Sequence, residues 1–149
     1  MIRRRAAALS LALILVSAAG AASAAVQFVQ STPLTQVVNT PVGNVAPGTI
    51  NVPVITWGGD IATIHANGNA PTTKPGAFSK LGLNYKLVRE DVFAKQVEAY
   101  LSGRSPYLRG TLGMINMAAE VTAKDSRTKP VIIYQLTWSA GGDALVVKG

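Results

Sequence analysis

The residues of this chain best suited to hold a small molecule lie near its carboxyl end, in the segment Trp138-Ser139-Ala140-Gly141-Gly142-Asp143. Ser139 offers a hydroxyl, Trp138 offers a flat apolar face with one N–H donor, and the glycines allow a sharp turn or a close approach of backbone to ligand. The flanking runs Val131–Leu136 and Ala144–Val147 are rich in Val, Ile and Leu, which predicts two strands buried on both faces. A β-hairpin whose turn contains two glycines explains the same residues equally well.

A second polar stretch, Trp57-Gly58-Gly59-Asp60, lies between a predicted strand and a predicted helix. The strand is Val52–Trp57, and the helix is Ile61–Ala66 with Asp60 as its N-cap. A strand, a glycine turn and a helix N-terminus expose backbone N–H groups that suit an anionic or strongly polar group. A tight turn between a strand and a helix requires the same residues, so both interpretations stay open.

Strands and helices are predicted to alternate along the chain. The predicted strands are Val52–Trp57, Tyr85–Val88, Tyr107–Leu112, Val131–Leu136 and Ala144–Val147, and the predicted helices are Ile61–Ala66, Val92–Ser102 and Ala118–Ala123. Asp91 and Gly103 are the predicted start and stop signals of the middle helix, and Asn116 is a candidate cap for the last one. The glycines and prolines of Asn67–Lys80 predict a loop. This alternation favours an α/β fold with a mostly parallel sheet and flanking helices.

Three polar stretches follow predicted strands in this arrangement: Gly58–Asp60, Thr111–Asn116 and Ser139–Asp143. Parallel sheets bind their ligands at the carboxyl ends of the strands. We therefore expect the three stretches to meet at one edge of the sheet and to form a single solute site.

The first 24 residues have the pattern of an export signal. Arg3, Arg4 and Arg5 form a positive segment, Ala6–Val16 is apolar, and Ala22-Ser23-Ala24 is a small-residue cleavage site. The apolar run is short for a bilayer span, which requires about 20 residues. We expect cleavage before Ala25 and a periplasmic mature protein.

The next segment, Ala25–Asn51, contains three prolines and no charged residue, which predicts an extended linker. Residues 52–149 then form one domain.

The charge and the cysteine content exclude some classes of partner. The formal charge is +7, but three of the 14 basic residues belong to the export signal, and the others are scattered without interleaved aromatic residues. Nucleic-acid binding is therefore not favoured. The chain has no cysteine and a single histidine, His65, so we expect neither a disulfide framework nor a metal site, and no cofactor.

Taken together, these stretches resemble the amino-terminal lobe of periplasmic solute-binding proteins of ABC importers, and most nearly the nitrate/sulfonate/taurine group. The similar segments are GAFSKLGLNYKLV (Gly76–Val88), VEAYLSGRSPYLRGTLGMINMAAE (Val97–Glu120) and WSAGGDALVVK (Trp138–Lys148). The resemblance extends over Val52–Gly149. It implies one lobe of a type II periplasmic-binding-protein-like fold, preceded by a signal peptide and a linker, with the second lobe absent.

The resemblance also implies a function and a set of contacts. The chain is expected to bind a small anionic or polar solute and to deliver it to an ABC permease in the inner membrane, without making or breaking a bond. Carried over by position, the ligand contacts are Trp57, Gly58, Gly59, Asp60, Thr111, Asn116, Trp138, Ser139, Gly141 and Gly142.

Two other functions stay open at this point. The chain is also compatible with an exported envelope interaction domain that has no role in transport. A hydrolase with Ser139 as nucleophile requires a general base, and the sole histidine, His65, lies in a different segment. We therefore expect a binding protein and not an enzyme.

Overall fold

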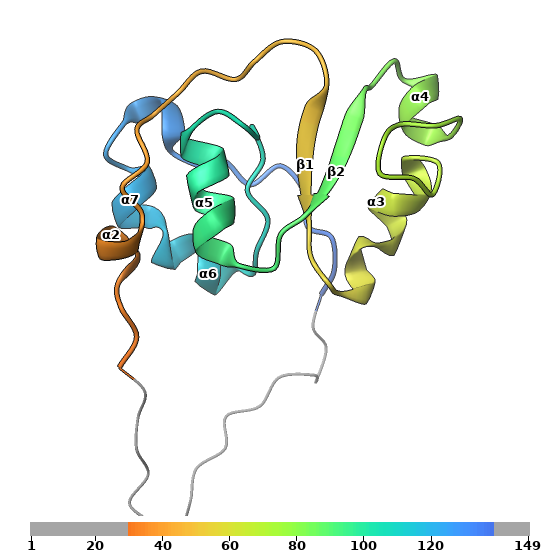
Figure 1. Cartoon of the computed structure of the whole chain (residues 1–149). Helices are drawn as coiled ribbons and strands as arrows, with labels where there is room; N and C mark the ends of the chain where they lie inside the picture. Colours follow the sequence, from red (N-terminus) through yellow and green to blue (C-terminus); the bar gives the residue numbers. More distant parts are fainter. Residues whose placement is uncertain (1–29, 139–149) are drawn as a thin grey trace, which may run out of the picture. The chain divides into compact units, whose positions relative to one another are not determined.

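A computed structural model describes residues 30–138 of the 149-residue chain (Figure 1). The predicted signal peptide, the loop residues Ser139, Gly141 and Gly142, and the predicted strand Ala144–Val147 lie outside the described residues. A compact unit begins at Thr32. This unit is a small α/β domain in which helices flank a two-stranded parallel sheet.

The elements follow one another in the order α2 (Leu34–Val37), β1 (Ile50–Val54), the 3-10 turn η1 (Gly58–Asp60), α3 (Ile61–Ala66), α4 (Ala77–Lys80), β2 (Tyr85–Arg89), α5 (Phe93–Leu101), α6 (Leu112–Met117), α7 (Ala119–Thr122) and the 3-10 turn η2 (Ser126–Thr128). In Figure 1, α3 and α4 lie on one side of the two strands, and α2, α5, α6 and α7 lie on the other.

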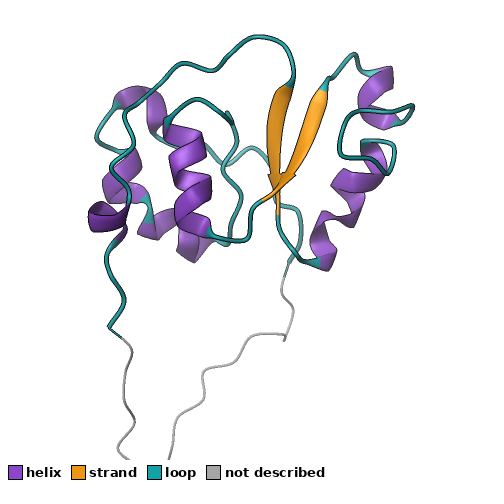
Figure 2. Ribbon diagram, viewed as in Figure 1, coloured by secondary structure: helices purple, strands orange, loops and turns teal. Residues whose placement is uncertain are grey.

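The predicted β-α-β unit is confirmed. β1 and β2 are parallel neighbours, with Ile50 opposite Tyr85 and Val54 opposite Arg89 (Figure 2). β1 begins and ends earlier than the predicted strand Val52–Trp57. It ends at Val54 because the N–H of Ile55 donates to the carboxylate of Asp60 and not to a neighbouring strand. The alternating apolar residues therefore identified both strands, while a side chain from the following turn set the end of β1.

The predicted middle helix is also confirmed, within one residue at each end. α5 places Phe93, Val97 and Leu101 on one face, and Gly103 follows it with a positive φ of 76°, as a helix stop signal does. The prediction that Asp91 caps this helix is wrong. The N-cap position is Val92, whose N–H donates to the side chain of Glu90.

Loop segments cover parts of both edges of the sheet. Along β2, the N–H of Leu87 donates to the carbonyl of Pro71, and the predicted loop Asn67–Lys80 forms an antiparallel bridge there. Along β1, the hydroxyl of Ser105 donates to the carbonyl of Asn51 at 2.8 Å. Pro53, also in β1, has no N–H to donate. Neither edge offers a full row of donors and acceptors to a further strand.

The predicted strand Tyr107–Leu112 is wrong, because side chains take its backbone donors. The N–H of Tyr107 donates to the hydroxyl of Ser105, and the N–H of Arg109 donates to the side-chain carbonyl of Gln96. Local bonds of this kind compete with strand pairing. The chain stays irregular up to Thr111, the N-cap residue, and α6 begins at Leu112.

The predicted buried strand Val131–Leu136 is wrong as well. Its backbone forms no strand, and Val131, Ile132, Ile133 and Tyr134 are between 70% and 80% exposed. A β-forming sequence becomes a strand only where a neighbouring strand offers free backbone groups, and the edges of this sheet are partly occupied.

The core lies on the α5 side of the sheet. Its five buried residues are Val38, Val97, Leu101, Ala118 and Val121. Part of the predicted linker Ala25–Asn51 belongs to this core, since Val38 is 2% exposed and Leu34 and Val42 pack against the cluster. The apolar pairs in that segment are therefore packing residues, and the packed unit begins before Val52.

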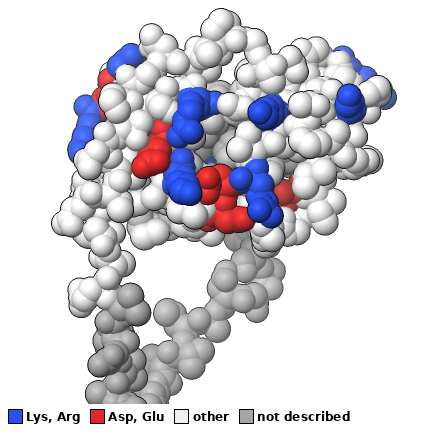
Figure 3. Space-filling model, viewed as in Figure 1, with Lys and Arg blue, Asp and Glu red and all other residues white. Residues whose placement is uncertain are grey.

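Every helix within residues 30–138 is too short or too polar to cross a lipid bilayer. On the face drawn in Figure 3, Asp and Glu side chains lie among Lys and Arg side chains. The charges on this face are therefore mixed and do not form a uniform basic surface.

Candidate functional site

The loops that follow β1 and β2 lie side by side, because the two strands are parallel and in register up to Val54 and Arg89. The Asp91 carboxylate joins these loops: it accepts the N–H of Thr56 at 2.6 Å and its hydroxyl at 2.9 Å. These bonds, with a smaller contribution from Arg89, lower the pKa of Asp91. The carboxyl ends of the strands are thus held together by a polar contact that sequence spacing does not reveal.

A buried ion pair lies next to this contact. Asp60 is 1% exposed, and its two carboxylate oxygens have different partners. Oδ2 accepts the N–H of Ile55, and Oδ1 accepts Nε–H of Arg109, each at 2.8 Å. The Arg109 side chain is only 11% exposed. Charges removed from water to this extent are normally paired, so Asp60 and Arg109 act as one unit.

Arg109 is held from three directions. Its backbone N–H donates to Oε1 of Gln96 at 3.3 Å, and Nε2 of Gln96 donates to the carbonyl of Glu90 at 2.8 Å. Its guanidinium carbon lies 5.0 Å from the centre of the Trp57 ring, within the range of a cation–π contact. We call Trp57, Asp60, Gln96 and Arg109 the Arg109 cluster. It joins η1, α5 and the irregular segment before α6 at the carboxyl end of the sheet.

One buried side-chain atom of this cluster has no hydrogen-bond partner. Nη2 of Arg109 is buried and unpaired within the part of the chain that the structure describes. Buried donors, and charged ones above all, nearly always have a partner. The cluster is therefore both compact and chemically incomplete.

The two glycines of the predicted site play different structural parts. A Cβ on Gly59 would collide with the Trp57 ring, whereas a Cβ on Gly58 would meet open space. Gly59 thus allows the indole to pack across the turn. The predicted N-cap residue Asp60 occupies the N-cap position of α3, but its side chain makes no capping bond, because both oxygens are used by Ile55 and Arg109.

The other predicted contacts make no hydrogen bond to the Arg109 cluster within residues 30–138. Thr111 caps α6, its hydroxyl oxygen accepting the N–H of Met114 at 3.2 Å. Asn116 is exposed inside α6, so the expectation that it caps the following helix is wrong. Trp138 is exposed, and Ser139, Gly141 and Gly142 lie outside the described residues. Trp57, Gly58, Gly59 and Asp60 follow β1 directly, at the carboxyl end of the sheet, and the expectation that the three polar stretches meet there stays a prediction.

Sequence reasoning missed Arg109 and Gln96. A signal for Arg109 existed: it is the only charged residue within Tyr107–Leu112, a segment that otherwise suggested an apolar strand. Gln96 had a weaker signal, namely its position beside Val97 at the border of the apolar face of the predicted helix. In the structure it is 2% exposed. Buried polar residues at such positions require partners, and these two are partners of each other.

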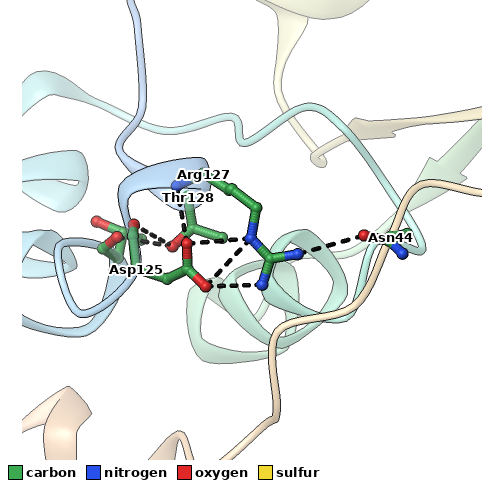
Figure 4. Close-up of polar contacts among 5 residues, drawn as sticks. Asn44, Asp125, Arg127 and Thr128 are labelled. Carbon is green, nitrogen blue, oxygen red and sulfur yellow. Dashed lines mark hydrogen bonds and ion pairs between the residues drawn. The ribbon is translucent and has the colours of Figure 1, made fainter.

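A second polar cluster lies at the other end of α5 (Figure 4). Arg127 donates to Asp125 through Nη2 at 2.7 Å and Nε at 3.1 Å, and through Nη1 to the side-chain carbonyl of Asn44 at 3.3 Å. The Arg127 bonds lower the pKa of Asp125 to about 2. Asn44, Arg127 and Tyr100 line a hollow of about 250 Å³. Because its guanidinium is already paired, this cluster is suited to joining η2 to the segment before β1.

Metal ligation has no candidate within residues 30–138, where no three His, Asp or Glu side chains come together. No protein-family model matches the chain, and no curated protein or solved structure matches it. A function for the Arg109 cluster therefore rests on its own residues.

Proposed function

We propose that this protein is the extracytoplasmic substrate-binding component of an ABC importer for a small anionic or polar solute, of the nitrate, sulfonate or taurine kind. The single observation that carries the proposal is the Arg109 cluster. It lies where parallel α/β sheets bind their ligands, and it contains an arginine with a buried, unpaired donor. A binding protein requires no nucleophile or general base, and this cluster supplies none.

The remaining features support the proposal at a coarser level. The α/β domain with a parallel β-α-β unit is compatible with a solute-binding lobe. The export signal expected at residues 1–24 directs such a protein to the periplasm, where it meets the permease. The unpaired Nη2 donor of Arg109 suits a ligand with oxygen acceptors.

Calorimetry on the full chain, purified after export, tests this function. Nitrate, taurine and a short organic sulfonate are titrated separately, with choline and glucose as controls of opposite or no charge. We expect heat from at least one of the anions or taurine and none from the controls. Absence of binding to every solute refutes the proposal. Mass spectrometry of the same sample checks the export signal, with Ala25 expected as the first residue.

A second function is favoured by a different observation. Val131, Ile132, Ile133 and Tyr134 form a continuous exposed apolar segment, which is unusual for a protein without an interaction partner. An exported envelope interaction domain accounts for that segment without any solute. Analytical ultracentrifugation separates the two functions, because an interaction domain associates through this segment whether or not an anion is present. The variant Ile133→Lys then abolishes association and leaves solute binding intact.

A further inference from the structure

The unpaired Nη2 atom of Arg109 follows from the way Asp60 binds its partner. A guanidinium and a carboxylate usually form two parallel hydrogen bonds. Here Oδ2 of Asp60 is committed to the N–H of Ile55, so only Oδ1 is free for Arg109, and it accepts Nε–H. The ion pair is therefore one-sided. Asp60 fixes the guanidinium and offsets part of its charge, while the Nη2 edge keeps its donors for another acceptor.

Trp57 is the side chain that covers this guanidinium. Its ring centre lies 5.0 Å from the guanidinium carbon, and the residue is 49% exposed, so one ring face contacts the arginine while much of the side chain remains in solvent. Because Nη2 of Arg109 is buried, a ligand can contact it only after a covering side chain has moved. Trp57 is suited to this because about half of its side chain already lies in solvent and not in the core.

The segments around Arg109 contribute exposed apolar side chains. Ile61 follows Asp60, Val92 follows the loop after β2, and Leu112 is the first residue of α6, three positions after Arg109. Each of them is at least 50% exposed. Exposed apolar side chains on the segments that also supply a charged donor suit a ligand that has a charged end and an apolar end.

We propose that Nη2 of Arg109 binds one oxygen of a small organic oxyanion, a sulfonate or a carboxylate with a short apolar chain, after the Trp57 ring moves aside. This inference rests on the proposed function and names the ligand class and the binding residue. Asp60 is a positioning residue, since its carboxylate contacts Arg109 and not the solute.

The first test uses the unaltered protein. Sodium butanesulfonate and sodium butyrate are added to the full ¹⁵N-labelled chain, and the two indole N–H signals are followed by NMR, with the variant Trp138→Phe assigning them. We expect the Trp57 signal to shift with saturation and the Trp138 signal to stay in place. If calorimetry detects binding while the Trp57 signal does not move, the ligand binds elsewhere. That outcome overturns the inference and leaves the proposed function standing.

The second test changes the donor. Arg109→Lys keeps the positive charge beside Asp60 but removes the Nη2 edge, so we expect butanesulfonate affinity to fall about tenfold or more. Arg104→Lys is the matched control, because Arg104 is exposed and its backbone carbonyl accepts a bond from Asn51. Affinity should be unchanged there. If the wild type and Arg109→Lys bind butanesulfonate with equal affinity, Nη2 is not the donor. If the wild type binds nitrate and butanesulfonate with equal affinity, the apolar chain of the ligand is not recognised. Absence of binding to all anions refutes the proposed function as well.

Discussion

The buried pair of Asp60 and Arg109 makes a strong prediction about stability. Asp60→Asn keeps a side-chain oxygen for the N–H of Ile55 but removes the charge that compensates a guanidinium only 11% exposed. Removing one partner of a buried ion pair costs about 3 kcal/mol, because the other charge is left uncompensated. A domain of this size is stabilised by roughly 5 to 15 kcal/mol. With five buried residues in its core cluster, this one belongs at the lower end, and the substitution removes a large part of its stability.

Urea unfolding followed by far-ultraviolet circular dichroism measures this loss. A domain of this size loses about 1.2 kcal/mol of stability per molar urea, so Asp60→Asn lowers the midpoint by about 2 to 3 M. The double variant Asp60→Asn/Arg109→Met removes both charges and keeps an apolar chain of similar length. We expect it to regain about 1 M or more relative to the single variant, because the uncompensated charge is gone.

The exposed pair of Arg89 and Asp91 provides the control. Its two charged atoms are 3.8 Å apart and the side chains are 75% and 48% exposed. Asparagine also keeps an oxygen for the N–H of Thr56, so Asp91→Asn shifts the midpoint less than Asp60→Asn. The two side chains are not coupled if the urea midpoint of Asp60→Asn stays within about 0.5 M of the wild type. They are also not coupled if adding Arg109→Met to Asp60→Asn lowers the midpoint further. The description of the Arg109 cluster is then wrong.

Three further predictions concern packing, backbone and charge. Val97→Ala removes two methyl groups from a side chain with no exposed surface, and urea unfolding should show a loss of about 2 kcal/mol. Gly103→Ala should cost about 2 kcal/mol or more, because φ is 76° and the new Cβ collides with a backbone carbonyl. The control Gly82→Ala has φ of 70° and open space, so thermal unfolding should show only about 1 kcal/mol. Arg127 lowers the pKa of Asp125 from 3.8 to about 2. The midpoint difference between the wild type and Asp125→Asn should therefore be full above about pH 5, shrink as the pH falls through about 4 to 2, and be lost only below about pH 2.

The first half of the fold could be predicted because its signals are local. Apolar residues at strand spacing indicate β1 and β2, and the spacing of Phe93, Val97 and Leu101 indicates α5. Each of these elements follows from its own residues. The turn after β1 required glycine for a reason that is also local, since Gly59 lies under the ring of the nearby Trp57.

The second half could not be predicted in the same way, because its structure depends on which backbone groups are already used. Tyr107 and Arg109 lose their N–H groups to side chains, one of them from α5. Val131–Leu136 has the composition of a buried strand but has no strand beside it. Propensity predicts what a segment prefers, and the availability of a neighbour decides what it does.

The same distinction explains the candidate site. The sequence pattern of a strand, two glycines and an aspartate suggested backbone donors facing a ligand, with Asp60 among the contacts. In the structure the turn directs Asp60 inward, to the N–H of Ile55 and to Arg109, 49 residues further along the chain. A carboxylate that holds a guanidinium by one nitrogen leaves the guanidinium both fixed in place and incompletely paired, as a preorganised anion site requires. Under the proposed function, the turn contributes by placing an acid beside an arginine, and the donor for the solute comes from a segment whose sequence alone suggested a strand.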